Sequence, residues 1–173
     1  MVQNGIDSRA SELQFVEAQQ EQVSDMLALY NYYITNSTAT FDLEAISADA
    51  FLQRIRLHHP DYKTYIIRLD GSMVGFCFFV PYRQNPAYRM TVEIGLYFKP
   101  ACTGKRYGEA AVHHLEQVIR EHGYRTIIAS ISSDNTPSIR LFERLGYRQC
   151  ADYREIAYKH GHYVGIVDFQ KVL

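Results

Sequence analysis

Cysteine, an excess of one charge and long apolar runs are what this sequence lacks or has least of. Its three cysteines, Cys77, Cys102 and Cys150, are scattered without CxxC spacing, which argues against a disulfide framework or a thiolate zinc site. The 18 Lys and Arg against 19 Asp and Glu leave a net charge of -1, so no global field attracts nucleic acid or an anionic membrane surface. The composition predicts a reducing, cytoplasmic location and small neutral or zwitterionic partners.

No apolar stretch is long enough to cross a bilayer, and the polar start of the chain has no apolar signal region. Residues 1–11 offer little to bury, so a flexible N-terminal extension is expected there. Residues 12–173 have a length that suits one hydrophobic core. We therefore expect a single domain that binds neither membrane nor nucleic acid.

Hydrophobic periodicity predicts strands and helices in alternation. Strands are expected near residues 13–16, 62–69, 73–80, 91–98, 126–131, 147–158 and 163–172. Helices are expected near residues 23–34, 47–59, 109–122 and 137–145. Asp70-Gly71 is a strong hairpin turn signal, and Gly123 is typical of a helix C-terminus. This order predicts an α/β, or α+β, domain with a mixed sheet and helices on its faces.

The strand at 91–98 carries the first chemical signal. Alternation places Val92 and its even-numbered neighbours on one face and Glu93 on the other, opposite the most apolar face. A short loop then feeds a helix, whose N-terminal amides can bind an anion. The loop residues are Thr103, Gly104, Lys105, Arg106, Tyr107 and Gly108. A carboxylate base beside an anion site suits acyl transfer from a phosphorylated carrier.

Four stretches carry a resemblance to a known family: residues 30–33 running into 37–41, then 86–93, 134–138 and 159–161. With the order of elements, they resemble the GNAT N-acetyltransferase superfamily, in its phosphinothricin or methionine sulfoximine acetyltransferase branch. The likeness covers nearly all of residues 12–173. It implies a mostly antiparallel sheet of about seven strands with about four helices, and a homodimer. It also implies acetyl-CoA as donor and a small amino acid amine as acceptor.

The resemblance assigns roles by position. Glu93 matches the family's general base. The residues that match the amino acid pocket are Phe41, Arg83 and Tyr88. The loop from Thr103 to Gly108 matches the pyrophosphate loop, and the residues expected along the pantetheine arm are Leu96, Tyr97, Phe98, Asn135 and Ser138.

Departures from the family pattern keep other interpretations open. Thr103 and Arg106 replace the usual opening residue and a glycine of the loop, and Asn85 and Phe142 stand where an Arg and a hydroxyl or imidazole are common. The departures predict altered CoA binding and an acceptor other than phosphinothricin. The alternatives are an acetyltransferase for a different amine and a GNAT-fold dimer that binds acyl-CoA or a small molecule with little or no turnover.

Several side chains have two interpretations from sequence alone. Glu93 is either the base or a solvated or salt-bridged strand residue, and Gly95 marks either a bulge or close packing. The oxyanion donor is expected at the main-chain N–H of Gly95 or Leu96. The adjacent His113 and His114 diverge on their helix, so we expect a surface pair and no metal site. Lys159 and His160 either reach the substrate or form a polar turn.

Overall fold

The computed structural model describes residues 12–173, and the extension expected at residues 1–11 lies outside them. The strands are β1 (Gln14–Glu17), β2 (Lys63–Leu69), β3 (Ser72–Pro81), β4 (Thr91–Phe98), β5 (Thr126–Ser132), β6 (Arg148–Lys159) and β7 (His162–Val172). The helices are α1 (Val23–Asn36), α2 (Ala48–Ile55), α3 (Tyr107–Glu121) and α4 (Thr136–Arg144), with short 3-10 turns η1 (Gln20–Gln22), η2 (Pro86–Tyr88) and η3 (Pro100–Cys102). The expected elements are therefore confirmed, and the 3-10 turns were not predicted.

All seven strands form one sheet in the order β1-β2-β3-β4-β5-β7-β6. Every neighbouring pair is antiparallel except β4 and β5, which run parallel. The parallel pair follows from its connection, because α3 carries the chain back across the sheet between the two strands. This arrangement confirms the predicted mixed, mostly antiparallel sheet.

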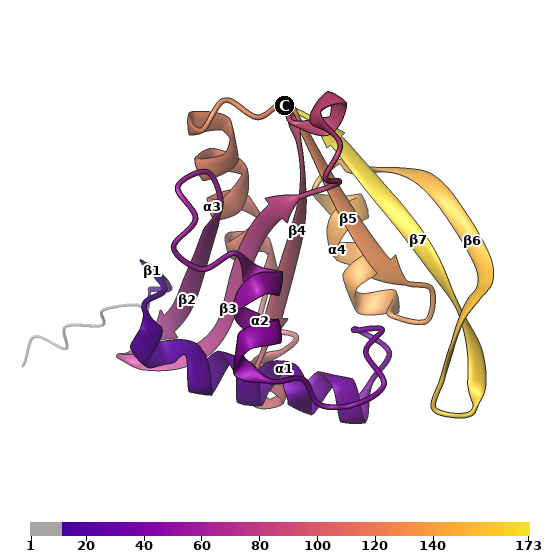
Figure 1. The fold of residues 1–173 in the computed structure, drawn as a ribbon, viewed down its shortest axis with the longest axis horizontal. Helices are drawn as coiled ribbons and strands as arrows, with labels where there is room; N and C mark the ends of the chain where they lie inside the picture. Colours follow the sequence, from indigo (N-terminus) through magenta and orange to yellow (C-terminus); the bar gives the residue numbers. More distant parts are fainter. Residues whose placement is uncertain (1–11) are drawn as a thin grey trace, which may run out of the picture.

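The helices cover the two faces of the sheet in pairs (Figure 1). α1 and α2 pack on one face, where Met26 and Phe51 bury against Phe76. α3 and α4 pack on the other, where Leu115 and Phe142 belong to the larger core. Both layers follow from amphipathic helices on a sheet whose strands alternate in side-chain direction.

The chain changes direction where the sequence offers the appropriate residues. The Ser47 side chain accepts a hydrogen bond from the Ala50 amide at 3.3 Å and so caps α2. The left-handed Arg56 ends that helix, which is therefore shorter than the expected 47–59. Asp70 and Gly71 both take positive φ at the β2–β3 turn, and Gly123 does so after α3, as predicted.

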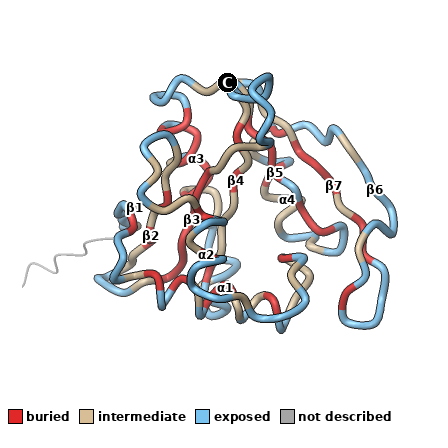
Figure 2. Tube along the Cα trace, in the orientation of Figure 1, coloured by how far each residue is buried: buried red, intermediate tan, exposed pale blue. Residues whose placement is uncertain are grey.

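β6 differs from the other long strands because nearly all its residues are exposed, whereas β7 is largely buried (Figure 2). Its register against β7 shifts between Tyr153 and Ala157, where Glu155 has a φ of 51°. The two strands form a long hairpin that extends beyond the rest of the sheet (Figure 1). Within residues 12–173, no helix combines the length and apolar character that a membrane span requires.

The prediction that both His113 and His114 lie on the surface is wrong for one of them. His113 is exposed, but His114 is half-buried between two aromatic rings, 4.3 Å from Phe15 and 4.5 Å from Tyr65 between ring centroids. Burial lowers the pKa of His114. The helix face predicted for His114 was therefore incorrect, because the edge strands β1 and β2 extend the sheet beneath it.

Candidate active site

The parallel strands β4 and β5 pair only at one end. Their last paired residues are Glu93 and Ile128, and beyond this point the strands separate. A cavity of about 600 Å³ lies in the gap, roofed by α1 and the segment that follows it. The predicted site residues that line it are Phe41, Glu93, Leu96, Tyr97, Asn135 and Ser138. Concave sites of this size with a few polar groups suit small ligands.

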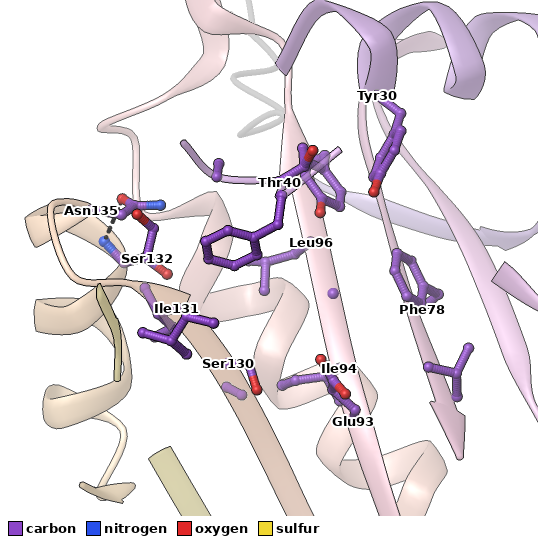
Figure 3. Close-up of a pocket in the computed structure, with 18 of the residues that line it drawn as sticks. Tyr30, Thr40, Phe78, Glu93, Ile94, Leu96, Ser130, Ile131, Ser132 and Asn135 are labelled. Atoms are coloured by element: carbon purple, nitrogen blue, oxygen red, sulfur yellow. Dashed lines mark hydrogen bonds between the residues drawn. The ribbon is translucent and has the colours of Figure 1, made fainter. Parts of the chain in front are cut away.

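Glu93 lines the cavity from β4 (Figure 3). Strand alternation puts it on the sheet face opposite Val92 and Ile94, which belong to the larger core. The Glu93 side chain is half-buried, and among residues 12–173 no ion pair reaches it. Burial raises the pKa of the Glu93 carboxyl, and the nearby Asp168 carboxylate raises it further, while Arg83 acts in the opposite direction. The carboxyl is therefore not a solvated or salt-bridged surface group. A carboxylate whose pKa is raised is a stronger base than an ordinary surface carboxylate, as a general base requires.

The main-chain N–H and C=O groups of β4 point alternately toward β3 and toward β5. Tyr82 donates its amide to the Thr91 carbonyl at 3.3 Å, so the odd-numbered residues bond to β3. The even-numbered residues face β5, and Leu96 lies beyond the last β4–β5 pair. The main-chain groups of Leu96 therefore face the gap and can bond to a ligand there.

Neighbouring positions on β4 are already occupied by the protein. The Tyr33 hydroxyl donates to the Phe98 carbonyl at 2.5 Å. The Tyr97 ring packs against Tyr30 and Phe76 with centroids 5.1 and 5.2 Å apart. Of the three β4 residues expected along a pantetheine arm, Leu96 is therefore an even-numbered residue in the gap for which no side chain of the described residues occupies the carbonyl.

Of the two interpretations of Gly95, a bulge or close packing, the structure has close packing. The β3–β4 register runs without a shift through the pair Phe78 and Gly95. A Cβ at position 95 would lie 2.4 Å from Phe78 Cζ, so only glycine leaves room for that ring. The alternative of a bulge at Gly95 is not what the structure has.

The predicted anion loop lies outside the cavity wall, at the N-terminus of α3. Residues 103–106 are exposed, and no side chain caps the helix. Gly104 and Arg106 both have positive φ, at 74° and 62°. Lys105 and Arg106 add positive charge to the helix dipole, so this terminus can bind an anion.

Gly108 and Asn135 each have a structural role at the start of a helix. A Cβ on Gly108 would lie 2.9 Å from Leu141 Cδ2, so glycine lets α3 approach α4 closely. The Asn135 side chain accepts a hydrogen bond from the Ser138 amide at 3.3 Å and caps α4. Asn135 and Ser138 therefore position α4 as well as lining the cavity.

The three residues expected in the amino acid pocket are not brought together within one chain. Phe41 lines the cavity and is 37% exposed. Arg83 is exposed, with its guanidinium carbon 4.9 Å from the centroid of the Tyr82 ring. Tyr88 packs edge-on against the same ring at 5.8 Å and does not line the cavity.

The sequence reasoning missed a polar cluster at the far end of the cavity from Glu93. The Tyr30 hydroxyl donates to Asp42 Oδ2 at 2.8 Å, and Arg54 Nη2 donates to Asp42 Oδ1 at 2.9 Å. Arg54 Nη1 also contacts the Tyr30 hydroxyl. Burial raises the pKa of Tyr30 to about 12. In sequence, Arg54 on an amphipathic helix and Asp42 directly after Phe41 were the available signals.

The segment between α1 and α2 is held over the cavity by bonds from distant parts of the chain. Lys159 is buried and donates to the Thr40 carbonyl at 2.8 Å, and His160 Nε2 lies 3.2 Å from the Ser37 carbonyl. Thr38 donates to Asp134 Oδ1 at 2.6 Å. Lys159 and His160 therefore fasten the β6–β7 turn to this segment, a role that neither sequence interpretation included.

Comparison with known proteins assigns the family. The model of the acetyltransferase (GNAT) family matches residues 26–147, more than half of the chain. The chain belongs to the GNAT acetyltransferase family. It is an acetyl-CoA-dependent N-acetyltransferase, and its relatives include a phosphinothricin N-acetyltransferase of Streptomyces coelicolor, 27% identical over 94% of this chain and 98% of the relative. Another is the L-methionine sulfoximine/L-methionine sulfone acetyltransferase of Salmonella typhimurium, 26% identical over 82% and 84%.

Solved structures agree with this GNAT assignment. A phosphinothricin acetyltransferase from Sinorhizobium meliloti in complex with acetyl-CoA shares the fold, with a TM-score of 0.87 and 24% identity over 94% of this chain and 88% of that one. An N-acetyltransferase from Staphylococcus aureus has a TM-score of 0.86 and 25% identity over 94% and 99%. The resemblance to the phosphinothricin and methionine sulfoximine acetyltransferase branch is confirmed.

Within residues 12–173, no group of three or more His, Cys, Asp or Glu side chains is arranged to hold a metal ion. His160 and His162 flank the β6–β7 turn, and His162 Nε2 lies 3.9 Å from Asp134 Oδ2. The Phe142 ring, noted in sequence for standing where a hydroxyl is common, is a core residue 4.9 Å from Tyr147 and 1% exposed. Its ring lines the cavity but carries no polar atom that could donate or accept a proton.

Proposed function

We propose that this N-acetyltransferase transfers the acetyl group of acetyl-CoA to the amine of a small amino acid or analogue, with Glu93 as general base. The observation that carries the proposal is a half-buried carboxyl with a raised pKa in the cavity between β4 and β5. The named activities of the relatives, on phosphinothricin and on methionine sulfoximine, support an amino acid analogue as acceptor.

The donor binds along β4, at the gap that β5 leaves open. The Leu96 main chain pairs with the pantetheine amides, in the way that a further strand would pair with a sheet edge. The N-terminus of α3, with Lys105 and Arg106, takes the pyrophosphate. Asn135 and Ser138 line the opposite wall. Phe98, whose carbonyl accepts the Tyr33 hydroxyl, contributes less to the donor site than Leu96.

The chemistry follows from these positions. The amine nitrogen attacks the thioester carbonyl, and its proton passes to Glu93 directly or through water. The carbonyl oxygen gains negative charge and is stabilised by the Leu96 N–H, since the Gly95 N–H belongs to the ladder with β3. The C–S bond then breaks and CoA leaves as a thiolate that water protonates. Phe41 lines the same cavity, and the cluster of Tyr30, Asp42 and Arg54 bounds the end far from Glu93.

We also propose that the protein acts as a cytoplasmic homodimer. The β6–β7 hairpin exposes Tyr158 and Tyr163, at 58% and 64%, with ring centroids 5.1 Å apart, and Ile156 at 57%. Exposed apolar groups in one region suit a partner surface. Arg83 and Tyr88 do not reach the cavity of their own chain, and a partner chain provides a reason for their exposure. The three free cysteines suit a reducing compartment.

Calorimetric titration of acetyl-CoA, followed by thiol release in the same sample with a panel of amino acids, tests the proposal. Binding with amine-dependent thiol release supports it. Binding without release from any amine would favour the second candidate, a GNAT-fold protein that holds acyl-CoA without turnover. The left-handed Arg106 in the anion loop is the observation that favours this candidate. No binding of acetyl-CoA would overturn both.

A further inference from the structure

A second carboxylate near Glu93 lacks a partner. Asp168 on β7 is only 9% exposed, and its Oδ1 is buried without a hydrogen bond. Its main chain pairs with Ser130 and Ala151 in the sheet, and Cys150 Sγ lies 3.4 Å from its carbonyl oxygen. Within residues 12–173, no ion pair or side-chain hydrogen bond reaches the Asp168 carboxylate. A buried carboxylate without partners is unfavourable unless a cation or donor joins it.

Strand register places Asp168 on the cavity face of the sheet. Glu93 pairs with Ile128 on β5, and Ser130, two residues further along β5, pairs with Asp168. Cross-strand partners share a face, so Glu93, Ser130 and Asp168 all project toward the side of α1. Ser130 lines the cavity near Glu93 (Figure 3), on the strand that lies between β4 and β7. Sheet spacings put the Cα atoms of Glu93 and Asp168 about 12 Å apart. The influence of Asp168 on the pKa of Glu93 agrees with this proximity.

Three cations of the surrounding elements are engaged elsewhere. Arg54 pairs with Asp42, and Lys159 donates to the Thr40 carbonyl. Lys171, on the same strand as Asp168, pairs with Glu116 at 2.8 Å. Arg83 is exposed on the loop after β3 and forms no ion pair within residues 12–173. The described chain therefore leaves the Asp168 carboxyl without a charged partner, on the strand next to Ser130, which lines the cavity.

We propose that Asp168 binds a second ammonium group of the acceptor, so that this enzyme prefers a dibasic amino acid over one with an uncharged side chain. This specificity rests on the proposed function. One amine is placed at Glu93 for acetylation, and the other donates charge-assisted hydrogen bonds to Asp168. A chain of three or four methylenes between the amines, with a hydrogen bond at each end, can span carboxylates that project from the same face of the sheet at positions about 12 Å apart. The substrate ammonium supplies the partner that the described chain lacks.

The test compares acceptors that differ only in the terminal ammonium: ornithine with norvaline, and lysine with norleucine. Thiol release gives kcat/KM for each with the wild type, Asp168→Asn and Asp152→Asn. The last is a matched control, because Asp152 is exposed on β6 and loses the same charge. We expect the wild type to prefer ornithine or lysine by about 10- to 100-fold, since a hydrogen bond to a charged group has this strength. Asp168→Asn should remove the preference by lowering kcat/KM for the dibasic acceptors alone.

Calorimetric binding of ornithine and norvaline in the presence of CoA separates this proposal from the proposed function. Turnover of all acceptors without preference for a dibasic one overturns the role of Asp168 and leaves the acetyltransferase standing. Ornithine binding that depends on Asp168 without turnover supports the ammonium site and overturns the proposed function. An equal loss for all acceptors in Asp168→Asn would make the residue structural and overturn the proposal. Circular dichroism of each variant checks that it is folded.

Discussion

Substituting Gly95 with alanine should both destabilise the protein and narrow its cavity. The new Cβ would lie 2.4, 2.7 and 3.0 Å from three atoms of the Phe78 ring. Favourable carbon–carbon contacts are about 3.5–4.0 Å, so the ring would have to move by about 1 Å. Phe78 is 6% exposed and stacks on Phe76 and Tyr97, with centroids 6.2 and 6.5 Å away. These neighbours leave the cavity, which Phe78 lines, as the direction of escape.

Overpacking of this kind costs about 1–3 kcal/mol of unfolding free energy. For a chain of this size, each kcal/mol shifts Tm by about 2–4 °C, so Gly95→Ala should lower Tm by about 2–12 °C. Urea denaturation measures the free energy, and thiol release measures the activity. We expect KM for the acceptor to rise, because the displaced ring occupies part of its site.

The double variant Gly95→Ala/Phe78→Leu is the control, because the smaller side chain removes the clash. Its loss of stability should be less than the sum of the two single losses, a coupling that a double-mutant cycle measures. If Gly95→Ala proved as stable as the wild type, or if the two losses simply added, the close packing of Gly95 and Phe78 would not be the reason for glycine here.

Three further predictions concern the base, the loop and the covering segment. Burial and Asp168 raise the pKa of Glu93, so kcat/KM should fall as the pH drops through a pKa above the usual range of Glu. Glu93→Gln should abolish this acidic limb of the pH profile and lower kcat by about 10²–10⁴-fold. The neutral carboxyl is the form that burial favours, so wild-type unfolding free energy in urea should fall as pH rises through that pKa, whereas Glu93→Gln should show no such fall. Arg106→Gly should raise the unfolding free energy by about 1 kcal/mol in thermal denaturation, because glycine adopts a φ of 62° without strain. The loss of the positive charge should weaken acetyl-CoA binding in calorimetry, most of all at low salt. Lys159→Met should cost about 1–3 kcal/mol and speed hydrogen exchange of the amides at 37–42, because the Thr40 carbonyl loses its donor; unchanged exchange would contradict this.

Local patterns in the sequence were enough to predict the elements and part of the site. The strand at 91–98 was predicted with its observed bounds because alternation and flanking turn residues are local signals. Glu93 and Phe41 were placed in the site from motifs, and both line the cavity. The extent of α2 was less predictable, because a left-handed Arg56 rather than Pro60 ends it.

The contacts that close the site were not predictable, because they join residues far apart in sequence. The bond from Lys159 to Thr40 spans 119 positions, and that from Thr38 to Asp134 spans 96. Neither partner shows a local pattern that points to the other. The same reasoning covers Asp168, whose proximity to Glu93 appears only when the order of β4, β5 and β7 is known.

The chemistry of the site depends on strand alternation in β4 at two levels. Side chains alternate between the α3 core and the cavity, so Val92 is fully buried while Glu93 reaches the acceptor side. Main-chain groups alternate between β3 and the gap, so Leu96 can stabilise an oxyanion while Gly95 completes the ladder. Because the period is two, a shift of one residue in the β3–β4 register would put Glu93 into the core and turn the Leu96 amide toward β3. The tight fit of Phe78 on Gly95 opposes that shift, since any other β4 residue in its place would bring a side chain against the ring. The packing of a glycine in the core thereby fixes both the base and the oxyanion donor.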